Sequence, residues 1–165
     1  MPGQSSIAQE FIDRIRQHQG ILYKVCAVYA HSGADREDLQ QEIILQLWRS
    51  YPGVQGRAAF STWMYRVALN TAITFTRKAT FFQEHTESLS VAADVGVSMD
   101  YSEDLRLLYA AIAKLNKVER AVILLWLEEK SYQEIADTLG MTEKNVSVRL
   151  VRIKAKLADI IEKMQ

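Results

Sequence analysis

The stretch that most constrains the fold is SYQEIADTLGMTEKNVSVRLVRIKAKL, residues 131–157, because it carries start and stop signals for two consecutive helices. Ser131 and Glu134 have the spacing of a capping box, which begins a helix. Gly140 is the residue type that most readily adopts the left-handed conformation that ends one, and Thr142 then offers an N-cap for a second helix. Two helices joined by so short a turn predict a helix-turn-helix.

The second helix of this pair combines an apolar stripe with an excess of basic residues. The stripe recurs at intervals of four, three and four residues, at Val146, Leu150, Ile153 and Leu157. Candidates for binding duplex DNA occupy the positions that the stripe leaves open: Lys144, Asn145, Ser147, Arg149, Arg152 and Lys156. The N-terminal residues of such a helix can enter a major groove while Arg and Lys neutralise phosphates. A solvated amphipathic helix is the plain alternative, but it does not explain why cap, turn and basic excess coincide.

The rest of the chain also favours helix. Only seven glycines and two prolines occur in 165 residues, whose long stretches are rich in helix-forming residues, so we predict an all-α fold. A supporting helix is expected to begin after Asn116, which is a suitable N-cap, with Glu119 at the third helical position. The single cysteine, Cys26, lies among apolar residues and is interpreted as a small core residue.

A net charge of zero hides a segregation of charge along the chain. Residues 1–78 hold nine Lys and Arg against six Asp and Glu, and residues 105–165 hold eleven against eight. The stretch between them, residues 79–104, holds six acidic residues and no basic one, and it lacks sustained helical periodicity. We therefore predict two small helical domains, 1–78 and 105–165, joined by an acidic flexible linker at 79–104. The sequence leaves open whether the free protein is extended or is compact, with the two domains docked and their DNA-binding faces partly covered.

The stretch AFSTWMYRVALNTA, residues 59–72, predicts a helix with two different faces. Its buried stripe is expected to comprise Phe60, Met64, Val67, Ala68, Thr71 and Phe75. A second stripe is aromatic, polar and cationic at once and comprises Trp63, Arg66, Asn70, Thr74 and Arg77. Single-stranded nucleic acid needs such stacking surfaces, amide hydrogen bonds and phosphate partners. The alternative, in which Trp63 is partly buried at the edge of the core and Arg66 extends to the surface, stays open.

The preceding helix, in DREDLQQEIILQLWRS, residues 35–50, also has two faces. Leu39, Ile43 and Leu47 share the core side, which leaves Leu45 and Trp48 exposed if the helix packs on one side only. An exposed apolar pair among charged and amide groups suggests a partner protein. A second buried contact within the same domain is the alternative.

In their order and spacing, these three stretches resemble RNA polymerase sigma factors of the extracytoplasmic-function group of the sigma-70 family. The resemblance covers nearly the whole chain apart from the linker and the first few residues. It implies a sigma factor that directs core RNA polymerase to specific promoters and opens promoter DNA. It assigns the binding of core polymerase to five residues: Asp38, Gln41, Glu42, Leu45 and Trp48. It assigns the melting minus-ten strand to the second stripe defined above, and the minus-thirty-five duplex to the helix-turn-helix.

The resemblance also places a pocket for a flipped base near Asn70 and the loop from Tyr51 to Arg57, and it admits an anti-sigma factor as a further partner. Two departures bear on function. Asn116 stands where the family commonly has Pro, and keeps the helix start by capping. Asn145, Val146 and Ser147 replace the usual Thr-Val pair and basic residue, so the promoter sequence stays open.

Other classes of function find little support in the sequence. The three histidines are scattered, at positions 18, 31 and 85, and there is neither a Cys/His cluster for a metal nor a glycine-rich phosphate loop. We therefore expect no enzyme, no metal and no cofactor. Without a signal peptide or an apolar run of membrane-spanning length, we expect a cytoplasmic protein that does not insert into membranes. A promoter-binding activator or repressor is the runner-up, but it would not need Trp63, Arg66 and Asn70 on one face. A protein-interaction module without DNA leaves the basic recognition helix unexplained.

Overall fold

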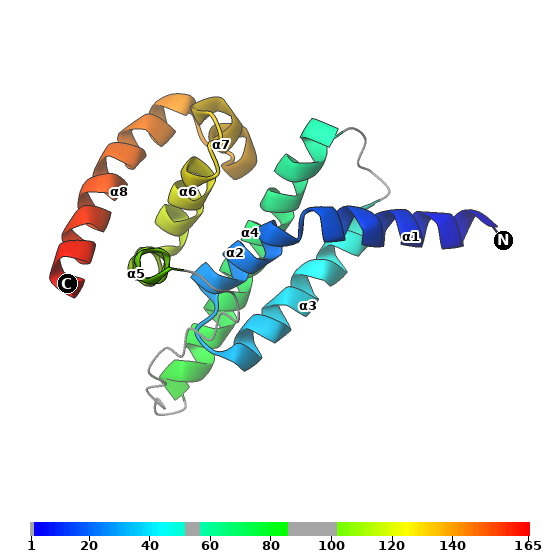
Figure 1. The fold of residues 1–165 in the computed structure, drawn as a ribbon, viewed down its shortest axis with the longest axis horizontal. Coiled ribbons are helices and arrows are strands. Elements are labelled where there is room, and N and C mark those ends of the chain that lie inside the picture. Colours follow the sequence, from blue (N-terminus) through cyan, green and yellow to red (C-terminus); the bar gives the residue numbers. More distant parts are fainter. Residues whose placement is uncertain (1, 52–56, 86–101) are drawn as a thin grey trace.

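The structure, a computed structural model, describes residues 2–51, 57–85 and 102–165, with side chains described for 6–51, 60–75 and 102–165. All regular elements in these ranges are helices, which confirms the predicted all-α class. In chain order they are α1 (Pro2–Gln17), α2 (Gln19–Tyr29), α3 (Gly33–Ser50), α4 (Arg57–His85), α5 (Glu103–Ile112), α6 (Lys117–Leu127), α7 (Tyr132–Leu139) and α8 (Glu143–Met164). Figure 1 shows α1 to α4 on one side of the molecule and α5 to α8 on the other, and we call these groups the N-terminal and C-terminal domains.

The N-terminal domain is built on α4, against which both α2 and α3 pack. Helix α3 begins at an N-cap, Ser32, whose hydroxyl accepts a hydrogen bond from the backbone N–H of Asp35 at 3.0 Å. The predicted core side of α3 is confirmed, since Leu39, Ile43 and Leu47 are fully buried. Together these contacts fix the faces that α3 and α4 turn outward.

The C-terminal domain has the local signals that the sequence predicted. Capping boxes begin α6, at Asn116 and Glu119, and α7, at Ser131 and Glu134. Gly140 ends α7 in the left-handed conformation, with φ 68°, and Thr142 caps α8. Helices α7 and α8 pack against each other, so the predicted helix-turn-helix is confirmed.

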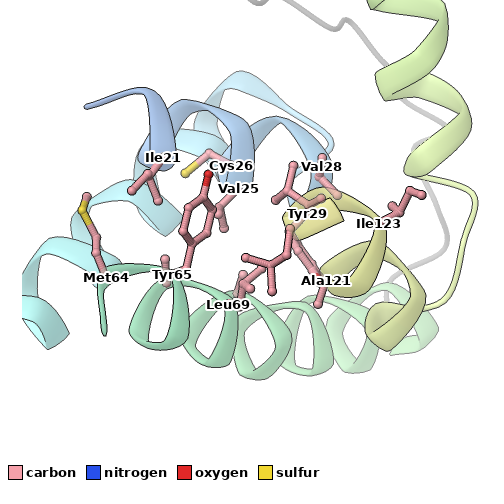
Figure 2. Close-up of a cluster of buried hydrophobic side chains, with 14 of the residues drawn as sticks. Ile21, Val25, Cys26, Val28, Tyr29, Met64, Tyr65, Leu69, Ala121 and Ile123 are labelled. Carbon is pink, nitrogen blue, oxygen red and sulfur yellow. The ribbon is translucent and has the colours of Figure 1, made fainter. Parts of the chain in front are cut away.

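The two domains pack together through helices far apart in the sequence. Helix α4 contacts α7, while α2 contacts α5 and α6. Figure 2 shows Tyr29 of α2 and Leu69 of α4 beside Ala121 of α6, so one apolar core runs from the first domain into the second. Burial also confirms the interpretation of Cys26, and it raises the pKa of the thiol to about 12 against the opposing effect of Arg36.

Helix α4 buries residues outside the predicted stripe as well as within it. Phe60, Met64 and Ala68 are buried as expected, but Val67, Thr71 and Phe75 are only half-buried. Three residues outside the stripe are buried as well, namely Tyr65, Leu69 and Ala72. The physical reason is that α2 packs on α4 in addition to α3, and Figure 2 shows Tyr65 directed toward Val25 and Cys26 of α2.

The ends of the domains extend into the predicted linker. Helix α4 continues to His85, and α5 begins at Glu103 with Ser102 as its N-cap. The remaining part of the predicted linker, residues 86–101, lies outside the described residues, as do residues 52–56 of the loop between Tyr51 and Arg57.

Candidate nucleic-acid and partner interfaces

An apolar groove of about 440 Å³ lies between α1 and α3. From α3 it is lined by Gln41, Leu45 and Trp48, and from α1 by Phe11 and Ile12. Leu45 and Trp48 are 41% and 42% exposed, so the predicted exposed apolar pair is confirmed. The Trp48 ring meets the Phe11 ring edge-on, with centroids 5.0 Å apart, so α1 orients the indole without covering it.

The groove includes a residue that the sequence analysis missed. Ile12 of α1 is 42% exposed and continues the apolar surface of Leu45 and Trp48. The signal was present in the sequence, since Phe11 and Ile15 take the core positions of α1 and leave Ile12 on another face. Of the remaining predicted partner residues, Asp38 is exposed on α3, whereas Glu42 lies in a different hollow.

This second hollow, of about 590 Å³, lies between α3 and α4. It is lined by Glu42, Gln46, Arg49, Ser50, Val67, Asn70, Thr71, Thr74 and Phe75. Asn70 and Thr74 are exposed there, one turn apart on α4, and the hydroxyl of Thr74 donates to the Asn70 carbonyl at 3.0 Å. The carboxamide of Asn70 can hydrogen-bond a base edge, and the guanidinium of Arg49, which also lines the hollow, can hold a phosphate.

The structure places Trp63 elsewhere, at the edge of the core. It is half-buried between Phe60 and Tyr51, with ring centroids at 5.4 and 6.3 Å. The position of Trp63 therefore matches the alternative interpretation, in which it is partly buried at the edge of the core. The side chain of Arg77, the last member of the predicted stripe, lies outside the part that the structure describes.

Arg66 of α4 reaches across to the C-terminal domain. Its Nη2 donates to the carbonyl oxygen of Asp137 at 2.7 Å, and its Nε donates to that of Thr138 at 3.4 Å. These carbonyls belong to the last turn of α7, where helical carbonyls lack partners within the helix and the dipole favours a cation. Arg66 thus caps the first helix of the helix-turn-helix from the other domain.

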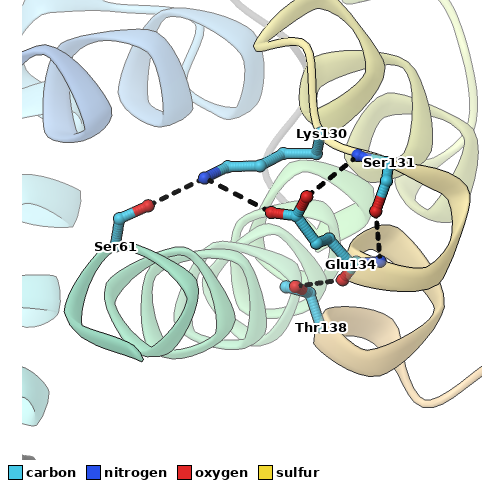
Figure 3. Close-up of polar contacts among 5 residues, drawn as sticks. All are labelled: Ser61, Lys130, Ser131, Glu134 and Thr138. Atoms are coloured by element: carbon cyan, nitrogen blue, oxygen red, sulfur yellow. Dashed lines mark hydrogen bonds and ion pairs between the residues drawn. The ribbon is translucent and has the colours of Figure 1, made fainter. Parts of the chain in front are cut away.

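Further polar contacts join the two domains near the start of α7. Lys24 of α2 forms an ion pair with Glu128, and the Lys130 ammonium donates to the Ser61 hydroxyl at 2.9 Å. Figure 3 shows Lys130 between Ser61 and Glu134, whose carboxylate also accepts from the backbone N–H of Ser131 in the capping box. The docked arrangement is therefore held by charge as well as by the shared core.

The recognition helix α8 presents its predicted residues unevenly. Lys144, Asn145, Arg152 and Lys156 are exposed, while Ser147 and Arg149 are half-buried. The Nε of Arg149 donates to the Asn145 side-chain oxygen at 3.0 Å, so these two residues form a pair.

Lys156 is held against its own domain, because its ammonium donates to the Glu119 carboxylate at 3.0 Å. Burial raises the pKa of Glu119, but hydrogen bonds from the Asn116 backbone and from Lys156 outweigh it and hold the pKa below its usual range.

Two valines that the sequence analysis missed, Val148 and Val151, are exposed on α8.

The residues that the structure describes meet the requirements of neither a metal site nor a membrane-spanning helix. Across the described ranges, no group of three or more His, Cys, Asp or Glu side chains is placed to hold a metal ion. No helix in the part of the chain that the structure describes is both long and apolar enough to cross a membrane.

Two sequence families match the chain. Residues 8–82 match Sigma-70 region 2, and residues 105–157 match Sigma-70, region 4. The ECF RNA polymerase sigma factor SigL of Mycobacterium tuberculosis (strain ATCC 35801 / TMC 107 / Erdman) is 31% identical over 150 residues, which cover 81% of this chain and 78% of SigL. The ECF RNA polymerase sigma factor SigG of Mycobacterium tuberculosis (strain CDC 1551 / Oshkosh) is 28% identical over 155 residues. That match covers 76% of this chain and only 42% of SigG.

Two solved structures share the fold. CnrH, in complex with the cytosolic domain of CnrY, aligns with a TM-score of 0.67 and 21% identity over 96% of this chain and 91% of CnrH. The sigma factor RpoE, in complex with the anti-sigma factor NepR from Bartonella quintana, aligns with a TM-score of 0.73 and 18% identity. The second alignment covers 93% of this chain and 98% of that one.

Proposed function

We propose that this chain, which belongs to the extracytoplasmic-function sigma factors of the sigma-70 family, directs core RNA polymerase to specific promoters and opens their DNA. The observation that carries the proposal is the hollow between α3 and α4, where Asn70 and Thr74 lie with Arg49. A hollow that combines apolar walls with Asn70, Thr74 and Arg49, in a chain that also has a helix-turn-helix, suits a protein that holds a separated strand and also binds duplex. A promoter-binding activator needs only to bind duplex DNA.

Core polymerase binds, on this proposal, at the apolar groove of α1 and α3. Leu45 and Trp48 supply apolar contact, and Gln41 supplies hydrogen bonds at its side. A helix of the polymerase clamp would fill the groove as an amphipathic helix fills an apolar cleft. Asp38 contributes from the same exposed side of α3, whereas Glu42 faces the hollow.

The minus-ten strand binds along α3 and α4. A flipped base would enter the hollow and meet the Asn70 carboxamide, while Arg49 pairs with a phosphate. Trp63 can stack with a base only through the part of its ring that is not packed on Phe60 and Tyr51. Arg66 can reach DNA only after it leaves the carbonyls of α7.

The minus-thirty-five duplex binds the C-terminal domain through α8. Lys144 and Arg152 are exposed and free to approach phosphates, and the pair of Asn145 and Arg149 lies beside them. The roles proposed for the chain are thus polymerase binding and minus-ten melting for residues 1–78, linkage for 79–104 and minus-thirty-five reading for 105–165. The protein acts without enzymatic chemistry of its own, in the cytoplasm where polymerase and DNA meet.

An anti-sigma factor is a further proposed partner. The solved structure of a protein of this fold with the anti-sigma factor NepR supports it, because it shows that such a fold can be bound by a regulator. In this chain a regulator that binds both domains would act by stabilising the docked arrangement.

Run-off transcription with core polymerase and genomic fragments tests the proposal. We expect promoter-dependent transcripts only when this protein is added, and a loss of open-complex formation in Asn70→Ala. Asp159→Asn, at an exposed position of α8 that does not line the hollow, serves as the matched control and should transcribe normally. Stimulation of polymerase that already carries another sigma factor, with none from core polymerase, would indicate an activator and contradict the proposal.

A further inference from the structure

Val148 stands out on α8 because it is apolar and exposed in the middle of a polar face. The buried stripe of this helix runs through Val146, Leu150 and Ile153. Val148 lies on the opposite side and is 43% exposed, so the packing of the domain does not account for it.

The neighbours of Val148 are cationic. Lys144 precedes it by four residues and Arg152 follows it by four, so the three side chains lie in one row along the helix. Both cations are exposed. They can hold phosphates on either side of a groove, which would bring Val148 to the base edges between them.

Base edges in the major groove offer one apolar group, the 5-methyl of thymine. A valine among phosphate-binding cations in the second turn of a recognition helix therefore has one chemical partner in the duplex. We infer that Val148 contacts a thymine methyl in the minus-thirty-five element and determines the preference for thymine at that position. The inference rests on the proposed function, and it identifies the base that one residue of the DNA-binding face of α8 contacts.

Val151 provides a matched control within the same helix. It is 70% exposed, more than Val148, and lies three residues later. That spacing places it about 4.5 Å farther along the helix axis, away from the N-terminal end that enters the groove. Exposure alone would make Val151 the stronger candidate, whereas groove geometry favours Val148.

The test removes one methyl from the DNA and the matching methyls from the protein. Holoenzyme, assembled from core polymerase and the full chain, selects duplexes from a pool randomised over the minus-thirty-five region. Each thymine of the selected sequence is then replaced singly by deoxyuridine, which lacks only the 5-methyl group. Binding of wild type should weaken about fourfold at one position, as expected for loss of one buried methyl.

Val148→Ala should bind the thymine and deoxyuridine duplexes equally at that position, while Val151→Ala should keep the wild-type difference. Because Val148 is exposed and Ala is a strong helix former, the variant should fold and melt like wild type.

Three outcomes would overturn the inference. Equal sensitivity of Val148→Ala and wild type to deoxyuridine at every position would remove Val148 from the base contacts, while sequence selection by holoenzyme would leave the proposed function intact. Failure of Val148→Ala to assemble with core polymerase would place a protein, not DNA, on this face. Selection of no sequence by wild-type holoenzyme would reject the proposed function itself, and the inference with it.

Discussion

At the scale of single residues, Glu119 links two parts of the C-terminal domain. Its carboxylate accepts from the Asn116 backbone N–H at 3.0 Å, which completes the capping box of α6, and from Lys156 of α8. The ionised form is thereby favoured in the folded protein, so the pKa of Glu119 lies below its usual range. Stability from this group is present above the pKa of the unfolded chain and is lost as the pH falls through the folded pKa.

We predict that Glu119→Gln flattens the dependence of unfolding free energy on pH between about pH 3 and 5. Glutamine can still accept the hydrogen bond from Asn116 but carries no charge for Lys156, so at pH 7 the loss should stay below about 1 kcal/mol. Glu119→Ala removes the cap acceptor as well and should cost more. Urea unfolding of the three proteins at several pH values measures this, and an unchanged pH slope in Glu119→Gln would contradict it.

At the scale of elements, α1 and α3 form one surface. Leu45→Asp places a charge in the groove, and we expect it to weaken binding to core polymerase at least about thirtyfold, as for loss of a 2 kcal/mol anchor. Ile12→Ala should weaken binding less, and Gln9→Ala, on the exposed side of α1, should leave it unchanged. Affinity for fluorescent core polymerase gives the values. Unfolding of Leu45→Asp, seen by far-UV circular dichroism, would instead assign this residue to the core.

The recognition helix adds a prediction about Asn145 and Arg149. Because the Asn145 oxygen accepts from the Arg149 Nε, each residue orients the other, and their contributions to duplex binding should not be additive. Asn145→Ala combined with Arg149→Ala should lose less affinity than the two single losses predict together. Arg152→Ala, which serves as the comparison, should add independently to Asn145→Ala and reduce the salt slope by about one. Additive losses in the first pair would show that the hydrogen bond is not used on DNA.

At the scale of the whole molecule, the docking of the two domains occupies a residue proposed to bind DNA. Arg66 cannot cap α7 and hold a promoter strand at the same time. Docking and promoter binding therefore compete, and binding of core polymerase is expected to shift the balance toward the open form. This expectation can be tested at the ion pair of Lys24 and Glu128, neither of which is proposed to contact DNA.

Lys24→Glu should open the molecule, because two carboxylates would then face each other across the junction. We expect a larger radius of gyration by small-angle X-ray scattering and a roughly tenfold gain in affinity of the free protein for promoter duplex, equivalent to about 1.4 kcal/mol. The double variant Lys24→Glu/Glu128→Lys restores opposite charges and should return both values toward wild type. An opened Lys24→Glu protein with unchanged duplex affinity would show that docking does not restrain DNA binding.

The sequence by itself determined the local structure of this protein. The caps at Asn116, Ser131 and Thr142 and the turn at Gly140 could be predicted because each signal acts on backbone groups within about four residues. The core side of α3 and the exposure of Leu45 and Trp48 followed in the same way, since helical periodicity states which residues share a face.

Helical periodicity does not show which element packs against each face of a helix. Only the tertiary structure determines this. The stripe from Trp63 to Thr74 shares one side of α4, yet Trp63 packs at the core edge, Arg66 caps a helix of the other domain, and Asn70 lines a hollow with α3. Arg66 and Asp137 are 71 positions apart, so no local pattern could pair them. Tyr65 likewise packs toward Cys26 of α2, with the Lys130 ammonium of the other domain 6.0 Å from its ring centroid, because a helix side becomes core only when other elements pack against it.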